Sequence, residues 1–201
     1  IDNNGYLYTW GYDEHNTNAN SAYYLGNSLG QGTEVIYNNI PTKIYSDVSY
    51  LLIGNRGLTK NGEIVEWNKY MENDSCVPRI VKENVAKTGI ALYLTQDGEL
   101  YSIPQEENTQ LKGSYQNSDK LILTEVKDFD VGYKYFALKN DGSVWIFLLN
   151  GLTFENIEKP KKLIDNVSKM IVNPSYDSAA LFLKNDGTIW TYGGNEYGQC
   201  G

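Results

Sequence analysis

The chain has 201 residues, 41% of them apolar, which is enough for a buried core. The 25 acidic and 17 basic residues give a formal net charge of −8, which disfavours nucleic acid and anionic membrane surfaces as partners. No apolar run approaches the ~20 residues that a spanning helix needs, so we expect no membrane insertion.

Polar turns recur along the chain between short apolar runs. Asn-Gly or Asp-Gly pairs place glycines at five positions: Gly5, Gly62, Gly98, Gly142 and Gly187. An aliphatic residue follows each glycine by two positions, and Leu precedes the last four by four positions. Glycine tolerates the positive φ that a tight hairpin requires, so the pattern predicts five hairpins in an irregular internal repeat.

In chain order, we expect an orphan strand at 1–11, an insertion at 12–33, and repeats at about 34–68, 69–104, 105–148 and 149–201. Together they would form a single domain. Apolar residues occupy both sides of the strand after each glycine, which predicts sheets covered on both faces. All four tryptophans fall in the repeat columns, which predicts that they belong to the core. The insertion is either a surface loop without a role or a partner-binding loop.

The last repeat resembles a known family. Residues 184–201, KNDGTIWTYGGNEYGQCG, are similar to the repeat signature of the RCC1 (regulator of chromosome condensation) family, with Cys200 where the family usually has Leu. The Pro-basic-aliphatic half of the signature appears at 41–44, 78–80 and 160–163. This resemblance extends over essentially the whole chain.

The resemblance implies an all-β fold, an RCC1-like β-propeller of four-stranded blades. The family closes its ring with seven blades, so about four blades would form an incomplete arc or a fragment of a seven-bladed ring. Alternatively, the orphan strand completes the blade at the other end of the chain. An arc would leave the apolar faces of its end blades exposed, which a domain avoids with further blades or a partner.

Catalytic chemistry finds little support in the residue types. His15 is the only histidine, and it falls in the polar insertion, away from any recognisable nucleophile. Cys76 and Cys200 lack the short spacing of a metal or redox motif and are expected to be separate thiols. We therefore expect no enzyme, no metal site and no cofactor.

Tyrosines and acidic residues in the insertion and the exit loop are the candidate binding residues, because tyrosine is enriched in binding hot spots. They are Tyr12, Asp13, Tyr23, Tyr24, Glu196 and Tyr197. We expect a non-enzymatic module that binds a protein partner, and not nucleic acid, through these loops.

Two other function classes stay open. The first is a glycan-binding part of a bacterial surface protein, which agrees with an extracellular or cell-surface location. The second follows from the resemblance. It is a guanine-nucleotide exchange factor, like the eponymous member, or an enzyme inhibitor, like a bacterial relative that inhibits β-lactamases.

Overall fold

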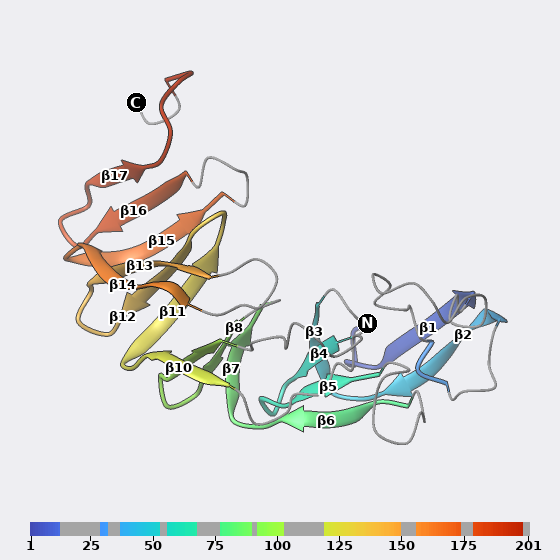
Figure 1. Cartoon of the computed structure of the whole chain (residues 1–201). Helices are drawn as coiled ribbons and strands as arrows, with labels where there is room; N and C mark the ends of the chain where they lie inside the picture. The colour runs from blue at the N-terminus through green and yellow to red at the C-terminus, as the bar shows by residue number, and fades with distance from the viewer. Residues whose placement is uncertain are drawn as a thin grey trace. The chain divides into compact units, whose positions relative to one another are not determined.

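The computed structural model describes residues 1–12, 29–31, 37–52, 56–67, 77–89, 92–102, 119–149, 156–173 and 179–198. Within these ranges all regular structure is β-strand (Figure 1), so no helix there could cross a membrane. The chain divides into two compact units, Ile1–Ile90 with Glu106–Ser118 and Ala91–Gln105 with Asp119–Gly201.

The first unit contains a two-stranded and a four-stranded antiparallel sheet. Strand β1 (Leu7–Tyr12) pairs with β2 (Tyr37–Tyr45). The second sheet has the order β3 (Val48–Leu52), β4 (Arg56–Thr59), β5 (Ile64–Glu66) and β6 (Arg79–Lys82), and β7 (Val85–Thr88) follows. The core of this unit is a cluster of Leu7, Val48, Val65 and Trp67, so β1 packs against the four-stranded sheet.

The second unit continues the pattern with ten strands, β8 to β17. They are β8 (Leu92–Thr95), β9 (Leu100–Ser102), β10 (Lys120–Leu123), β11 (Val126–Val131), β12 (Tyr135–Lys139), β13 (Val144–Leu149), β14 (Asn156–Ile164), β15 (Val167–Val172), β16 (Ala180–Lys184) and β17 (Ile189–Tyr192). Neighbours in β11-β12-β13-β14 and in β15-β16-β17 are antiparallel and consecutive in the chain. Each repeat therefore folds as a meander.

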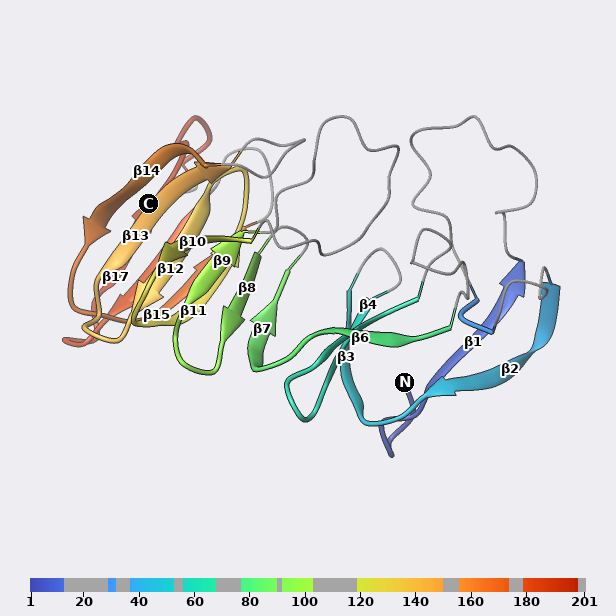
Figure 2. The same ribbon diagram turned by 60° about the horizontal axis from the view of Figure 1, so that its bottom comes forward.

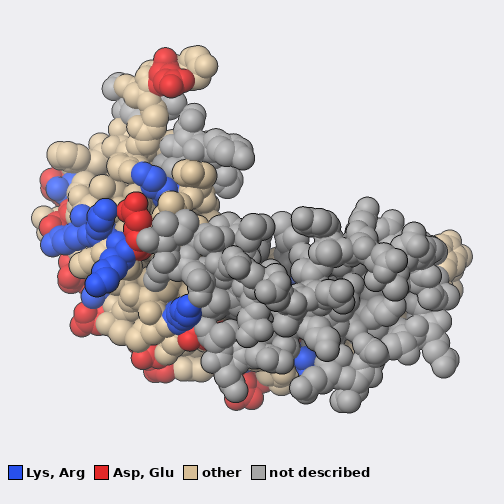
Figure 3. Space-filling model, viewed as in Figure 1, with Lys and Arg blue, Asp and Glu red and all other residues tan. Residues whose placement is uncertain are grey.

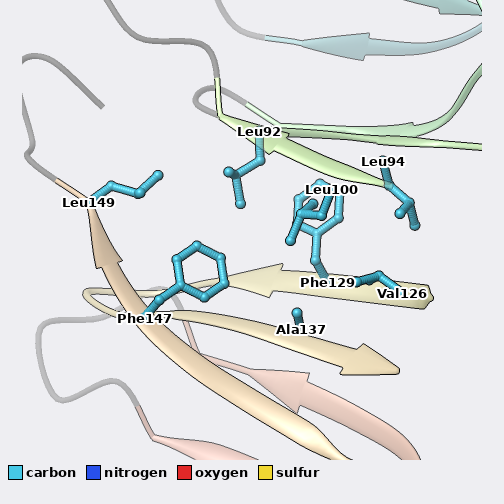
Figure 4. Packing of buried hydrophobic residues seen from close by; sticks show 8 residues of the cluster. All are labelled: Leu92, Leu94, Leu100, Val126, Phe129, Ala137, Phe147 and Leu149. Atoms are coloured by element: carbon cyan, nitrogen blue, oxygen red, sulfur yellow. The ribbon is translucent and has the colours of Figure 1, made fainter. Parts of the chain in front are cut away.

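Apolar side chains hold successive sheets of the second unit face to face (Figure 2). In Figure 4, Leu92, Leu94 and Leu100 of β8 and β9 meet residues of the next sheet. These are Val126, Phe129, Ala137, Phe147 and Leu149. A second cluster joins β12 and β13 to β15 and β16 through side chains that include Phe136 and Phe182. Sheets covered on both faces were predicted, and β11–β14 fits that prediction.

The hairpin glycines connect one sheet to the next. Gly142 has φ +82°, and the other four glycines of the predicted hairpins also have positive φ, which confirms the five turns. The carbonyl oxygen of Gly142 accepts a hydrogen bond of 2.9 Å from the backbone N–H of Val167, the first residue of the following sheet. A Cβ at position 142 would lie 3.3 Å from the Val167 oxygen, so the close approach of the two sheets requires glycine.

The sheets divide the chain at places other than the predicted repeat boundaries. The Pro-basic-aliphatic segments at 41–44, 78–80 and 160–163 were expected in the upstream half of their repeats. In the structure β6 pairs with β5, and β14 pairs with β13, so these segments close the preceding sheet. Likewise β2, placed in the repeat at 34–68, pairs with the orphan strand β1. Each boundary falls at a polar residue with φ near +60°, namely Asp47, Asn84, Glu125 and Asn166, which ends one sheet and starts the next.

An Asp side chain stabilises the turn of the 139–143 hairpin and makes it sensitive to acid. Asp141 Oδ1 accepts hydrogen bonds from the hydroxyl (2.6 Å) and backbone N–H (2.8 Å) of Ser143. These bonds, the hydroxyl first, hold the pKa of Asp141 below its ordinary value of 3.8. The pKa of Asp141 is lower in the folded state than in the unfolded state, where it is about 3.8. This stabilisation is therefore complete above pH 3.8 and is lost as the pH falls through the pKa of the folded state.

We expect Asp141→Asn, which keeps the Oδ1 acceptor and removes the charge, to lower Tm at pH 7. The difference in Tm from the unsubstituted chain should shrink as the pH falls below 3.8 and through the lower pKa of the folded state, because Asp141 then loses its charge as well. Thermal unfolding followed by circular dichroism between pH 7 and 2.5 measures this difference. A difference that stays constant over that range would show that the charge of Asp141 does not stabilise the turn.

Candidate protein interface

The loop that follows β17 carries two of the predicted binding residues side by side. Gly193 and Gly198 have φ of +133° and +76°, and the Gly198 N–H donates to the Asn195 carbonyl at 3.3 Å. This turn presents Glu196 and Tyr197 to solvent, and Tyr197 is 88% exposed. In Figure 3 the described residues of this loop show acidic atoms and no basic atoms. An exposed phenol beside a carboxylate suits a basic partner surface.

The other four predicted binding residues belong to the first unit. Tyr12 ends β1, where its backbone pairs with that of Tyr37. Asp13, Tyr23 and Tyr24 lie outside the described residues. The described residues therefore bring Glu196 and Tyr197 together, and they leave the remaining four as predictions.

The C-terminal end of the insertion is fixed to the β1–β2 sheet. The Gln31 side-chain N–H donates to the Thr9 carbonyl at 3.0 Å, and Asn38 Nδ2 donates to Gln31 Oε1 at 2.8 Å. The Thr9 hydroxyl donates to the Leu29 carbonyl. Gly30 has φ +69°, and a Cβ there would lie 2.9 Å from Trp67 Cδ1. Gly30 and Gln31 thus anchor this end of the insertion to the β1–β2 sheet.

The sequence analysis expected an incomplete arc to expose the apolar faces of its end blades, and the last sheet has an exposed aliphatic surface, although its residues were not named in advance. We call it the open face and define it as Ile171, Leu181, Leu183 and Ile189, which are 55%, 48%, 39% and 70% exposed. The register places Leu181 beside Ile171 and Leu183 beside Ile189, so the four side chains share one face of β15–β17. The opposite face, which includes Phe182 and Met170, is buried against β11–β14.

The prediction that all four tryptophans belong to the core is wrong for two of them. Trp67 is buried, Trp145 is half-buried, and Trp10 and Trp190 are 59% and 52% exposed. The indole N–H of Trp190 donates to the Thr188 hydroxyl at 3.1 Å, and Lys184 Nζ lies 5.0 Å from the ring centroid. The indole therefore packs along its own hairpin turn, between Thr188 and Lys184.

The side chains of the open face and the exit loop are of kinds that contact other molecules. The open face offers aliphatic carbon, which contributes through burial, and the exit loop offers an aromatic ring and a carboxylate. Within the described ranges, no three His, Cys, Asp or Glu side chains gather as they would around a metal ion. Exposed aliphatic patches are typical of surfaces that bind other molecules.

Comparison with protein-family models and with curated proteins finds no match. Among solved structures, Prp20p of Saccharomyces cerevisiae, described with its binding properties to Gsp1p and histones, has a TM-score of 0.50 and 15% identity. The match covers 94% of this chain and 54% of that one. Yeast RCC1 (Prp20) bound to Kap60 has a TM-score of 0.50 and 18% identity, over 96% and 53% of the two chains.

Human WBSCR16 matches with a TM-score of 0.47 and 18% identity, over 73% of this chain and 46% of its own. The chain thus spans about half the length of these solved structures. Consecutive antiparallel meanders, stacked through apolar faces in chain order, agree with the likeness to the two yeast structures. The chain has an RCC1-like β-propeller fold, as its sequence motifs predicted.

Proposed function

We propose that the chain is a non-enzymatic protein-interaction module. Its partner binds Tyr12 at the end of β1 together with the segments that carry Asp13, Tyr23, Tyr24, Glu196 and Tyr197. The observation that carries the proposal is the 88% exposure of Tyr197 directly after Glu196, on a loop with a defined turn.

The partner that fits this loop is a protein with a basic surface. Tyrosine supplies a large contact area at little cost in side-chain entropy, and a neighbouring carboxylate favours a positive counterpart. The formal charge of −8 of the whole chain would add long-range attraction toward such a surface. The two yeast neighbours are themselves described with protein partners, which supports a protein as the ligand class.

We expect Tyr197→Ala to weaken retention of the partner at least tenfold, about 1.4 kcal/mol, because exposed tyrosines that become buried are frequent hot spots. The immobilised chain is exposed to extract of its source cells, and each retained protein is titrated against the variants. Tyr133→Ala, a second exposed tyrosine of the same unit at 55%, is the matched control and should leave retention unchanged.

Equal losses for Tyr197→Ala and Tyr133→Ala would contradict a binding role for the exit loop. Retention of glycans on an array, lost in Tyr197→Ala, would assign the loop to carbohydrate binding. Stimulated nucleotide release from a small GTPase, lost in the same variant, would assign it to exchange activity.

A further inference from the structure

Strand β14 stands at one end of its four-stranded sheet, beyond β13 (Figure 2). Within the described residues its backbone pairs with β13 alone, so its other side is a strand edge. Strands β6 and β10 hold the same place in their sheets, and β2 holds it beside β1. We call these four the outer strands. A strand edge is a template on which a strand of another molecule can add.

The outer strands are either short or interrupted by proline. Strands β6 and β10 have four residues each, whereas β2 and β14 have nine each. Both long strands contain a proline, Pro41 in β2 and Pro160 in β14, and neither short strand does. Proline has no backbone N–H to donate, and a short edge offers few hydrogen-bonding groups. Each outer strand therefore has one of two features that hinder the addition of a further strand.

A β-bulge recurs at the same place in all four outer strands. Its extra residue is aliphatic and stands three positions before the boundary residue of positive φ. The four extra residues are Ile44, Val81, Ile122 and Leu163. In β14 the register with β13 shifts at two further points. Because a bulge bends and twists its strand, these edges lack the regular row of donors and acceptors that an added strand needs.

Strand β14 also carries three exposed lysines beside its proline, Lys159, Lys161 and Lys162. Two of them already have acidic neighbours in the same segment. Lys161 Nζ lies 3.1 Å from a Glu158 carboxylate oxygen, and Lys162 Nζ lies 2.6 Å from one of Asp165. Because these carboxylates balance the two charges, the lysines suit an edge that excludes other strands better than a site for an acidic ligand.

A second copy of the chain is the strand source that the lysines exclude most directly. Two β14 edges related by a two-fold axis would run antiparallel and bring lysines of one copy close to lysines of the other. Like charges opposite each other destabilise a strand pair. Pro160 would offer the added strand no N–H, and the bulges would misalign the remaining groups.

From these observations we infer that the outer strands are closed edges, which exclude strands of other molecules, and that Pro160 and its neighbouring lysines close the longest of them in the second unit. Shortness closes β6 and β10, whereas proline and bulges close β2 and β14. Partners therefore bind the chain by its loops and sheet faces and not by strand addition. This inference goes beyond the proposed function and holds whether or not the exit loop binds a partner.

Opening the β14 edge tests the inference. The open-edge variant is Lys159→Thr/Pro160→Thr/Lys161→Thr, because threonine favours strands and restores the N–H at position 160. The variant loses two positive charges from a chain of net charge −8, so repulsion between copies would oppose association. We expect its self-association constant, measured by sedimentation velocity over a concentration series, to exceed that of the unsubstituted chain at least tenfold. Hydrogen exchange of the 156–164 amides should slow as the copies associate.

Two controls separate closure of the edge from changes in charge and composition. Lys159→Glu/Lys161→Glu keeps Pro160 and a charged edge, and it should associate no more than the unsubstituted chain. Lys184→Thr makes the same replacement on β16, a central strand paired with both β15 and β17, and it should also leave association unchanged. Pro160→Thr alone is a milder opening that decides the test if the triple variant unfolds, and its association constant should also rise.

An association constant that stays at the unsubstituted value in the folded open-edge variant would overturn the inference. So would association that leaves hydrogen exchange at 156–164 unchanged, because the contact would then lie elsewhere. Equal association of Lys159→Glu/Lys161→Glu and the open-edge variant would also contradict it. Retention of the partner by the exit loop is measured separately, so either proposal can fail without the other.

Discussion

Replacing Gly142 by Val is expected to lower the free energy of unfolding by about 3 kcal/mol, among the larger effects of a single substitution outside an apolar cluster. Gly142 has φ +82°, a conformation that costs a β-branched residue roughly 1–3 kcal/mol. The added Cβ would also lie 3.3 Å from the Val167 oxygen, so the two sheets must separate slightly. Urea unfolding followed by tryptophan fluorescence measures the loss.

Gly187→Val is the matched control for this prediction. Gly187 has φ +84° in the same kind of Asp-Gly hairpin, but a Cβ there would meet nothing within 4 Å. Its cost should therefore be limited to the backbone conformation, about 1–2 kcal/mol. The difference between the two variants is the cost of separating two sheets. Equal losses would mean that the contact between Gly142 and Val167 does not tighten the junction.

The hairpins could be predicted because glycine chemistry marks them directly. An Asn-Gly or Asp-Gly pair between apolar runs identifies a turn, and Gly62, Gly98 and Gly142 each occur with positive φ where predicted. The sheet boundaries were harder to predict. They fall at residues such as Asp47 and Glu125, which have positive φ although they are not glycines. The sequence therefore carries no glycine that would mark these boundaries.

Burial was predictable only where a repeat has a neighbour on each side. The aliphatic columns before and after the hairpin glycines are the same in the last two repeats, yet Val144 is buried and Ile189 is 70% exposed. Residue type sets the preference for burial, whereas tertiary contact decides whether it is met. The exit loop was identified from Glu196 and Tyr197, and an exposed apolar face on an end blade was expected of an incomplete arc, but the residues that make up the open face could be named only from the structure.

Phe136→Ala is expected to cost about 3–5 kcal/mol of unfolding free energy, the range for truncating a fully buried aromatic side chain. Phe136 is 0% exposed, between Phe182 at 6.2 Å and Tyr192 at 5.7 Å in an edge-on contact. Its truncation leaves a cavity at the junction of two sheets, and those sheets are held apart by the remaining side chains, so the cavity cannot fully collapse.

Leu181→Ala, at the equivalent position of the last repeat, should cost less than about 1 kcal/mol in residues 1–201, because its side chain is 48% exposed. Urea unfolding of both variants gives the comparison, and similar costs would contradict the burial assigned to these positions. The difference between the two substitutions in unfolding free energy thus measures how much stability a side chain at this position contributes when a following sheet covers it.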